Sequence, residues 1–227
     1  MLNLATRARG RAMRTGCTRG TATLEFAIAF PVLILMLLSS VDVANLVTDS
    51  RRLQTVANTV GQLVSTTSSG SVTYADLQSA ASSAVVLFPA VLSQSYVGSE
   101  AWTSVISISI SSIVFIKTNP LCTSNCSYTA RVAWSGGSVP RPCGVNLAPA
   151  SDSAAPSPTT LPQDVFGPGS LIVADVVYTY TPTFLTIAST TFRKSSFIAP
   201  RYVPASSYIK YAVVSGDNGY ASSCPGY

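Results

Sequence analysis

The residues that could do chemistry in this chain are few, and histidine is not among them. The 227 residues include no histidine, nine aspartates and glutamates, and five cysteines. The most common general base of enzymes is therefore missing, and no serine has an evident neighbouring base that would activate it. No glycine-rich phosphate loop, paired-carboxylate spacing or metal-ligand cluster stands out. We therefore expect no enzyme activity, no cofactor and no metal.

The cysteines predict disulfides. Cys17 lies near the amino terminus, and the other four are Cys122, Cys126, Cys143 and Cys224. An even number suits two disulfides in an oxidising compartment, and four cysteines allow three pairings, between which the sequence does not choose. The spacing of Cys122 and Cys126 also fits half of a zinc site. We favour disulfides, because no second close pair follows.

A single acid, Glu25, stands at the start of a long apolar stretch. No residue from Phe26 to Leu38 is polar, and Thr21 to Val41 would form a helix of about 31 Å, close to the ~30 Å hydrocarbon core of a bilayer. Five arginines within residues 1–20 account for the net charge of +5 and favour a cytoplasmic amino end. We expect a single-pass anchor with an extracytoplasmic carboxyl part; the alternative is a buried core helix.

The residues from Gly20 to Phe26 carry a family resemblance. Their sequence, Gly-Thr-Ala-Thr-Leu-Glu-Phe, resembles the processing site of type IV prepilins. The segment Gly20–Val64 is similar, more closely, to the TadE/TadG-like pseudopilins of bacterial tight-adherence (Flp-type) pilus systems. The resemblance implies cleavage after Gly20 by a membrane prepilin peptidase. Thr21 would then be the first mature residue and Glu25 the fifth.

The resemblance also implies partners and a location. The expected partners are membrane lipid, the prepilin peptidase, other pilin or pseudopilin subunits and the pilus assembly machinery. We expect no nucleic-acid partner, because the excess positive charge lies in residues 1–20. The expected location is the inner membrane with a periplasmic head, and the chain would either be incorporated into a pilus or only aid its assembly. As a hypothesis, Glu25 pairs with the new ammonium of Thr21, within one chain or between subunits.

Beyond the anchor, apolar residues continue at helical spacing to Val64, so the periodicity predicts one helix over 21–65. We expect Asp49, Arg51 and Arg52 to form a solvated face just outside the membrane. Thr73, with Asp76 three positions later, predicts the start of a second helix that ends before Phe88-Pro89.

Strands are predicted in the remaining sequence. Ile106, Ile108 and Ile110 alternate with serines, which indicates a strand with one apolar face. The predicted strands are Val105–Ile116, Tyr128–Trp134, Leu171–Tyr180, Phe192–Ile198 and Ile209–Val214. Residues 135–170 are rich in Gly, Pro and Ser and predict an extended, mobile loop, held to the head through Cys143.

These observations predict an α+β, pilin-like fold with a small antiparallel sheet. The expected organisation is a basic leader (1–20), a transmembrane and amphipathic helix (21–65) and an extracytoplasmic head (66–227). The expected function is that of a minor pilin or pseudopilin in pilus assembly, adhesion or a related secretion apparatus. The alternatives are an unprocessed single-pass binding protein and a type II secretion pseudopilin. A membrane-anchored secreted enzyme is disfavoured by the missing histidine.

Overall fold

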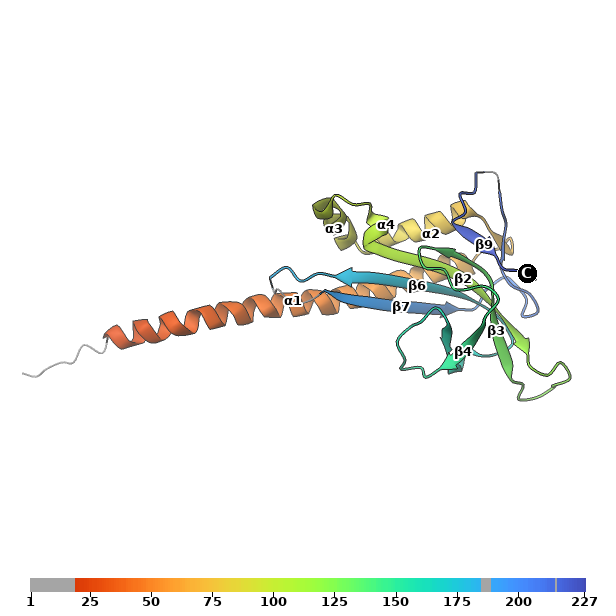
Figure 1. Cartoon of the computed structure of the whole chain (residues 1–227), viewed down its shortest axis with the longest axis horizontal. Coiled ribbons are helices and arrows are strands. Elements are labelled where there is room, and N and C mark those ends of the chain that lie inside the picture. The colour runs from red at the N-terminus through yellow and green to blue at the C-terminus, as the bar shows by residue number, and fades with distance from the viewer. Residues whose placement is uncertain (1–18, 185–188, 215) are drawn as a thin grey trace, which may run out of the picture.

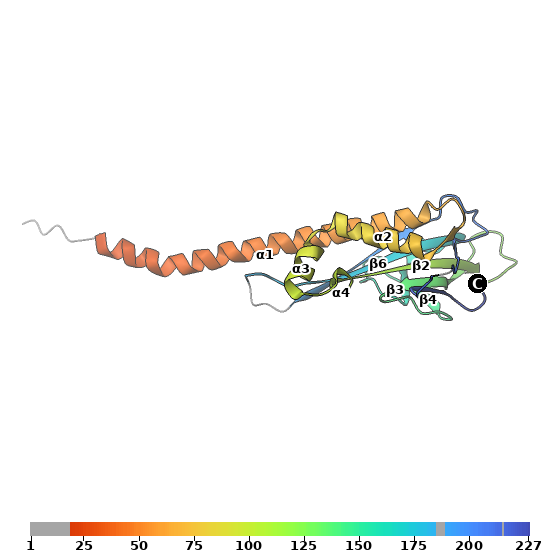
Figure 2. The ribbon, with the colours of Figure 1, turned by 90° about the horizontal axis from the view of Figure 1, so that it is seen from above.

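One long helix and a β-rich head make up the molecule. The computed structural model describes residues 19–184, 189–214 and 216–227. Most of the predicted leader, with Cys17, lies outside these residues. Helix α1 (Arg19–Ser65) runs without a break through Pro31, and its amino-terminal half projects from the head (Figures 1 and 2). The α+β class and the long apolar helix are confirmed.

The head contains three further helices, a 3-10 turn and nine strands among the described residues. The helices and the turn are α2 (Tyr74–Leu87), α3 (Ala90–Gly98), α4 (Trp102–Val105) and η1 (Gln163–Val165). The strands are β1 (Ser71–Val72), β2 (Ile106–Lys117), β3 (Tyr128–Gly137), β4 (Asn146–Ala150), β5 (Thr160–Pro162), β6 (Gly169–Tyr180), β7 (Thr190–Ile198), β8 (Lys210–Tyr211) and β9 (Ala221–Ser223).

Helix α2 begins and ends where the sequence predicts. The Thr73 side chain accepts a hydrogen bond from the Asp76 amide, and the Asp76 carboxylate accepts one from the Thr73 amide at 2.8 Å. This capping box satisfies backbone donors that the first turn leaves free. Helices α3 and α4 were not predicted, because their short sequences lack a clear apolar period.

The main sheet has the order β5-β4-β3-β2-β6-β7, and β9 pairs with β3. The pairs β2–β3, β2–β6 and β6–β7 are antiparallel, as predicted. The pairs β4–β5 and β1–β8 are parallel. The strand predicted at Ile209–Val214 is reduced to Lys210–Tyr211, because it pairs with only the two residues of β1.

The core lies between the carboxyl-terminal half of α1, helix α2 and one face of the sheet. Five α1 residues on one face, mostly three or four positions apart, are fully or almost fully buried: Leu53, Val56, Ala57, Val60 and Val64. The helix packs closely on the sheet, since a Cβ added at Gly61 would lie 3.0 Å from the Ile198 Cδ1 atom. Burial of this apolar stripe holds the helix to the head.

The expectation that β2 has only one buried face is wrong. Ile106, Ile108 and Ile110 face the main core, yet Ser109 and Ser111 on the other face are also buried. On that second face Ile113 and Phe115 join a smaller core with residues of β3, β4 and β6. The serines are satisfied there: Ser109 Oγ accepts from the Val139 amide at 2.9 Å, and Ser111 Oγ lies 2.7 Å from Ser135 Oγ.

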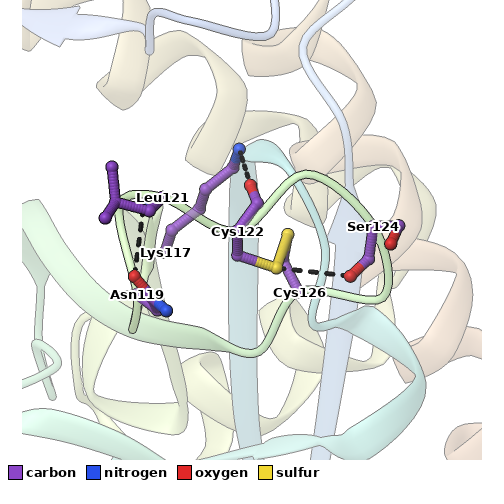
Figure 3. Close-up of a disulfide and its surroundings, with 6 residues drawn as sticks. All are labelled: Lys117, Asn119, Leu121, Cys122, Ser124 and Cys126. Atoms are coloured by element: carbon purple, nitrogen blue, oxygen red, sulfur yellow. Dashed lines mark hydrogen bonds between the residues drawn. A yellow bond between two sulfur atoms is a disulfide. The ribbon is translucent and has the colours of Figure 1, made fainter.

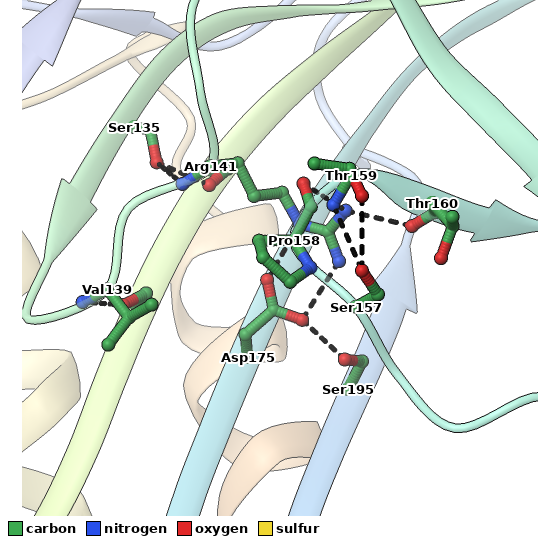
Figure 4. A network of polar contacts seen from close by, with 11 residues as sticks. Ser135, Val139, Arg141, Ser157, Pro158, Thr159, Thr160, Asp175 and Ser195 are labelled. Atoms are coloured by element: carbon green, nitrogen blue, oxygen red, sulfur yellow. Dashed lines mark hydrogen bonds and ion pairs between the residues drawn. The ribbon is translucent and has the colours of Figure 1, made fainter.

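The prediction of an extended, mobile loop over 135–170 is also wrong, because this segment contains β4, β5 and η1 and is tied down by Arg141 (Figure 4). Arg141 is 2% exposed, and its guanidinium binds both Asp175 carboxylate oxygens, at 2.7 and 3.0 Å. It also donates to the carbonyls of Pro158 and Thr160. A buried charge needs partners of this kind.

Two disulfides close the far parts of the head. Cys143 pairs with Cys224, which joins the proline-rich segment to the carboxyl terminus. Cys122 pairs with Cys126 in the β2–β3 hairpin, where Lys117 Nζ donates to the Cys122 carbonyl at 2.9 Å (Figure 3). The structure thus selects one of the three pairings, and it places Cys122 and Cys126 in a disulfide rather than in a zinc site.

We expect Arg141→Met to destabilise the head by about 3 kcal/mol, because the change leaves the Asp175 carboxylate partly buried without its cation. Thermal unfolding followed by the fluorescence of buried Trp134 measures the effect. Arg201→Met, at an exposed arginine, is the matched control and should change stability by less than about 0.5 kcal/mol. Equal stability of the two variants would contradict the structural role of the ion pair.

Candidate functional site

The projecting half of α1 is the first part of the candidate site. Its apolar side chains are exposed from Leu24 to Leu37 and again at Val41 and Val43, while Leu38 is half-buried. The acid Asp42, within this stretch, is buried. Among the described residues, one helix, within Thr23–Ser65, is by itself long and apolar enough to cross a membrane. So many exposed apolar side chains are unfavourable in water. The helix is consistent with a single-pass membrane anchor.

The predicted processing residues lie at the start of this helix. Gly20 and Thr21 belong to the first turns of α1, and their side chains lie outside the described set. Glu25 and Phe26 are exposed, and the Phe26 ring contacts the Phe30 ring with centroids 5.4 Å apart. Thr21 and Glu25 are four residues apart in α1, about one helical turn.

Asp42 marks the point where α1 meets the head. Its carboxylate is buried and accepts hydrogen bonds from the amides of Thr183 at 3.2 Å and Phe184 at 3.0 Å. The Tyr180 hydroxyl donates to the Asp42 carbonyl at 3.2 Å. These contacts bind the end of β6 and the residues after it to α1, immediately beyond the apolar span.

Asp49 lies two turns further along and corrects another expectation. Arg51 and Arg52 are exposed as predicted, but Asp49 is only 8% exposed and lines a cavity between α1, α3 and β6. Burial raises the pKa of the Asp49 carboxyl above its ordinary value, and the charge of Arg52 opposes part of the rise. Burial, with the Asp49 charge as a smaller cause, also raises the pKa of Tyr178 to about 12.

The described residues show no arrangement for metal chemistry. No group of three or more cysteine, aspartate or glutamate side chains among them could hold a metal ion. The four disulfide cysteines are paired in the head, away from the membrane-facing half of α1. The candidate site therefore consists of an apolar helix, one acid near its start (Glu25) and a polar junction around Asp42, where the helix meets the head.

Comparison with known families identifies this helix. Residues 20–61 match the family model described as TadE-like protein. This segment is TadE-like. The TadE-like match extends from Gly20 through the apolar span and into the half of α1 that packs on the head. No curated protein and no solved structure matches the chain. The TadE-like family suggests a protein associated with the membrane and with Tad pilus machinery in general.

Sequence reasoning found the TadE-like helix but missed the junction at its exit. Asp42 was not singled out, and Asp49 was assigned to a solvated face. One available signal was their spacing: the two acids are seven residues apart and continue the stripe that includes Leu46, Leu53 and Val60. Their burial depends on α3 and β6, whose positions the sequence does not give.

We expect Asp49→Asn to raise the thermal unfolding midpoint of the detergent-solubilised chain at pH ~7, because the ionised carboxylate is buried at a cost. A raised folded pKa means that the carboxyl contributes most to stability below about pH 4, and that this contribution is lost as pH rises through the folded value. The advantage of the variant should therefore grow from about pH 4 to pH 7.

Asp152→Asn is the control for this experiment, since Asp152 is exposed. Its unfolding midpoint should follow that of the wild type across the same pH range. A wild-type chain that is as stable as Asp49→Asn at neutral pH would contradict a net cost of burying this carboxylate.

Proposed function

We propose that the chain is a minor pilin or pseudopilin that takes part in the assembly of a tight-adherence (Flp-type) pilus. In this proposal residues 1–20 are a leader, residues 21–65 are the membrane and assembly helix, and residues 66–227 form the head. The chain is the substrate of a prepilin peptidase and has no catalytic activity of its own. In this proposal the tyrosines, serines and disulfides of the head stabilise its fold or contact partners and do not take part in catalysis.

The observation that carries the proposal is the TadE-like match and where it begins. It starts at Gly20, the residue that precedes the proposed cleavage point, and continues along α1. Five arginines precede this point, and an exposed apolar helix follows it. The order is a basic segment, then a small residue, then an apolar helix. This order is the one expected if a leader is removed and the anchor is retained.

Orientation and location follow from the same charge distribution. Arginines before the span favour retention of the amino end in the cytoplasm, so the head lies on the outer face of the inner membrane. An oxidising compartment also suits the two disulfides of the head.

Assembly would use the exposed half of α1. The small residues Ala27 and Ala29 are exposed on it and would allow close approach of a neighbouring helix. Cleavage would create an ammonium on Thr21, and Glu25 would pair with that ammonium in the same or a neighbouring subunit. Pairing offsets the cost of holding each charge at the membrane edge.

We expect Gly20→Ala to block maturation, because an added side chain at the residue before the cleaved bond would hinder the peptidase. Intact-mass and amino-terminal analysis of the protein from cells with the peptidase should give Thr21 for the wild type and Met1 for the variant. Gly10→Ala is the matched control and should mature normally, since no glutamate follows Gly10 at the fifth position. A wild-type chain that retains Met1 would instead indicate an unprocessed anchor.

We expect Glu25→Ala to reduce incorporation into the pilus-associated fraction by at least about tenfold, because the ammonium of Thr21 would lose its partner at the membrane edge. Quantitative immunoblotting of sheared filaments and membranes measures the split. Glu100→Ala, at an exposed acid of the head, is the control and should be incorporated normally. Unchanged processing and unchanged incorporation of Glu25→Ala together would refute the pairing role.

A further inference from the structure

The chain just beyond β6 is bound to the point where α1 leaves the head. The Asp42 carboxylate accepts hydrogen bonds from the amides of Thr183 and Phe184, and the Tyr180 hydroxyl donates to the Asp42 carbonyl. In Figures 1 and 2 this part of the head reaches further toward the projecting half of α1 than α2, α3 or α4 does. The hydrogen bonds therefore fix the position of Phe184 along α1.

This position coincides with the end of the apolar span. Asp42 directly follows Val41, the last residue of the span, so the two differ in height by about 1.5 Å along the helix axis. The headgroup layer of a bilayer extends about 5–8 Å beyond the hydrocarbon core on each side. The Phe184 amide, which is 3.0 Å from the Asp42 carboxylate, thus lies at the depth of this layer rather than in bulk water.

The Phe184 side chain has the chemistry of an interfacial group. It is 51% exposed, although it is aromatic and apolar. On α1, the exposed Val41 and Val43 flank Asp42 at the same depth. An exposed aromatic ring is unfavourable in water and is favoured at the boundary between lipid headgroups and acyl chains.

No exposed charge opposes contact between this end of the sheet and lipid. The sequence between Asp175 and Arg193 contains no lysine, arginine, aspartate or glutamate. Between Glu25 and Asp49 the helix has one charged residue, Asp42, which is 3% exposed and accepts the two backbone amides. A charged side chain at this depth would be costly to move from water. This end of the head can therefore enter the headgroup layer without that cost.

We propose that Phe184 is a second membrane contact, at which the head touches the bilayer surface beside its own anchor. The ring enters the interface at the carboxyl end of the apolar span, and Asp42 positions it there through the backbone of Thr183 and Phe184. A single helix leaves the head free to rotate about the helix axis, and a contact beside the helix restricts that rotation. The proposal rests on the membrane helix of the proposed function, but not on cleavage after Gly20 or on incorporation into a pilus.

The experiment measures the depth of residue 184 in a bilayer. Cys17→Ser removes the cysteine that lies outside the two disulfides. Phe184→Cys, Leu33→Cys and Tyr202→Cys are then made as separate variants, labelled with a nitroxide and reconstituted as full-length protein in phosphatidylcholine liposomes. Power-saturation electron paramagnetic resonance compares collisions of the label with oxygen, which concentrates in lipid, and with a nickel chelate, which stays in water.

Tyr202 is the matched aqueous control. It is also an aromatic residue, 65% exposed, and the amide of the preceding Arg201 donates to the Ser65 carbonyl at the other end of α1. Ser65 lies about 35 Å beyond Asp42 along the helix axis. Leu33, which is exposed within the apolar span, is the lipid control.

We expect the ratio of oxygen to nickel collisions at position 184 to be several-fold higher than at position 202 and lower than at position 33. Asp42→Ala removes the acceptor of both amides, so it should lower the ratio at position 184 toward that at position 202 and leave position 33 unchanged. Thermal unfolding shows that each variant is folded.

A second measurement keeps an aromatic ring at position 184. Phe184→Trp should add fluorescence that brominated phosphatidylcholine quenches, and Tyr202→Trp should add fluorescence that it does not quench. Equal quenching of the two added signals would overturn the proposal.

The labelled variants separate this proposal from the proposed function. Equal ratios at positions 184 and 202, with position 33 in lipid, would overturn the contact and leave the membrane helix intact. A label at position 33 that collides freely with the nickel chelate would overturn the membrane helix and this contact with it. Few collisions with either reagent at position 184 would assign the Phe184 ring to a protein contact and overturn the proposal.

Discussion

Burial of one stripe of α1 against the sheet is the interaction on which the rest of the structure depends. Leu53, Val56 and Val60 have no exposed surface, and they hold the carboxyl-terminal half of the helix against β6, β7 and α2. Because a helix is stiff, fixing this half also fixes the direction of the other half, which projects from the head with its apolar side chains exposed (Figure 2). One continuous element thus joins an exposed apolar span to a packed core.

The transition between these environments is made by polar groups. The Asp42 carboxylate accepts hydrogen bonds from two backbone amides of the chain beyond β6, and Asp49 lines the adjoining cavity. An acid directly after an apolar span is expensive in lipid and is stabilised by donors from the head. The junction therefore fixes where the head begins relative to the end of the apolar span.

The opposite face of the sheet shows where sequence reasoning reached its limit. In β2 the apolar residues alternate with serines up to Ile110 and then run without interruption from Ile113 to Ile116, which is a visible signal that both faces are covered. The covering segment could not be predicted, because its proline-rich sequence has no period of its own. Its structure depends on the ion pair between Arg141 and Asp175, which lies on a separate strand, and on the disulfide between Cys143 and Cys224, 81 residues away.

Local features could be predicted from residue spacing: the apolar span and its length, the stripe that continues to Val64, the capping box at Thr73 and the main strands. Each follows from residue spacing within one element, as does the TadE-like resemblance. Tertiary structure alone decided the disulfide pairing, the partner of Arg141 and the burial of Asp42 and Asp49. These depend on which distant elements meet, and chain spacing does not encode the contacts that α3 and β6 make with α1.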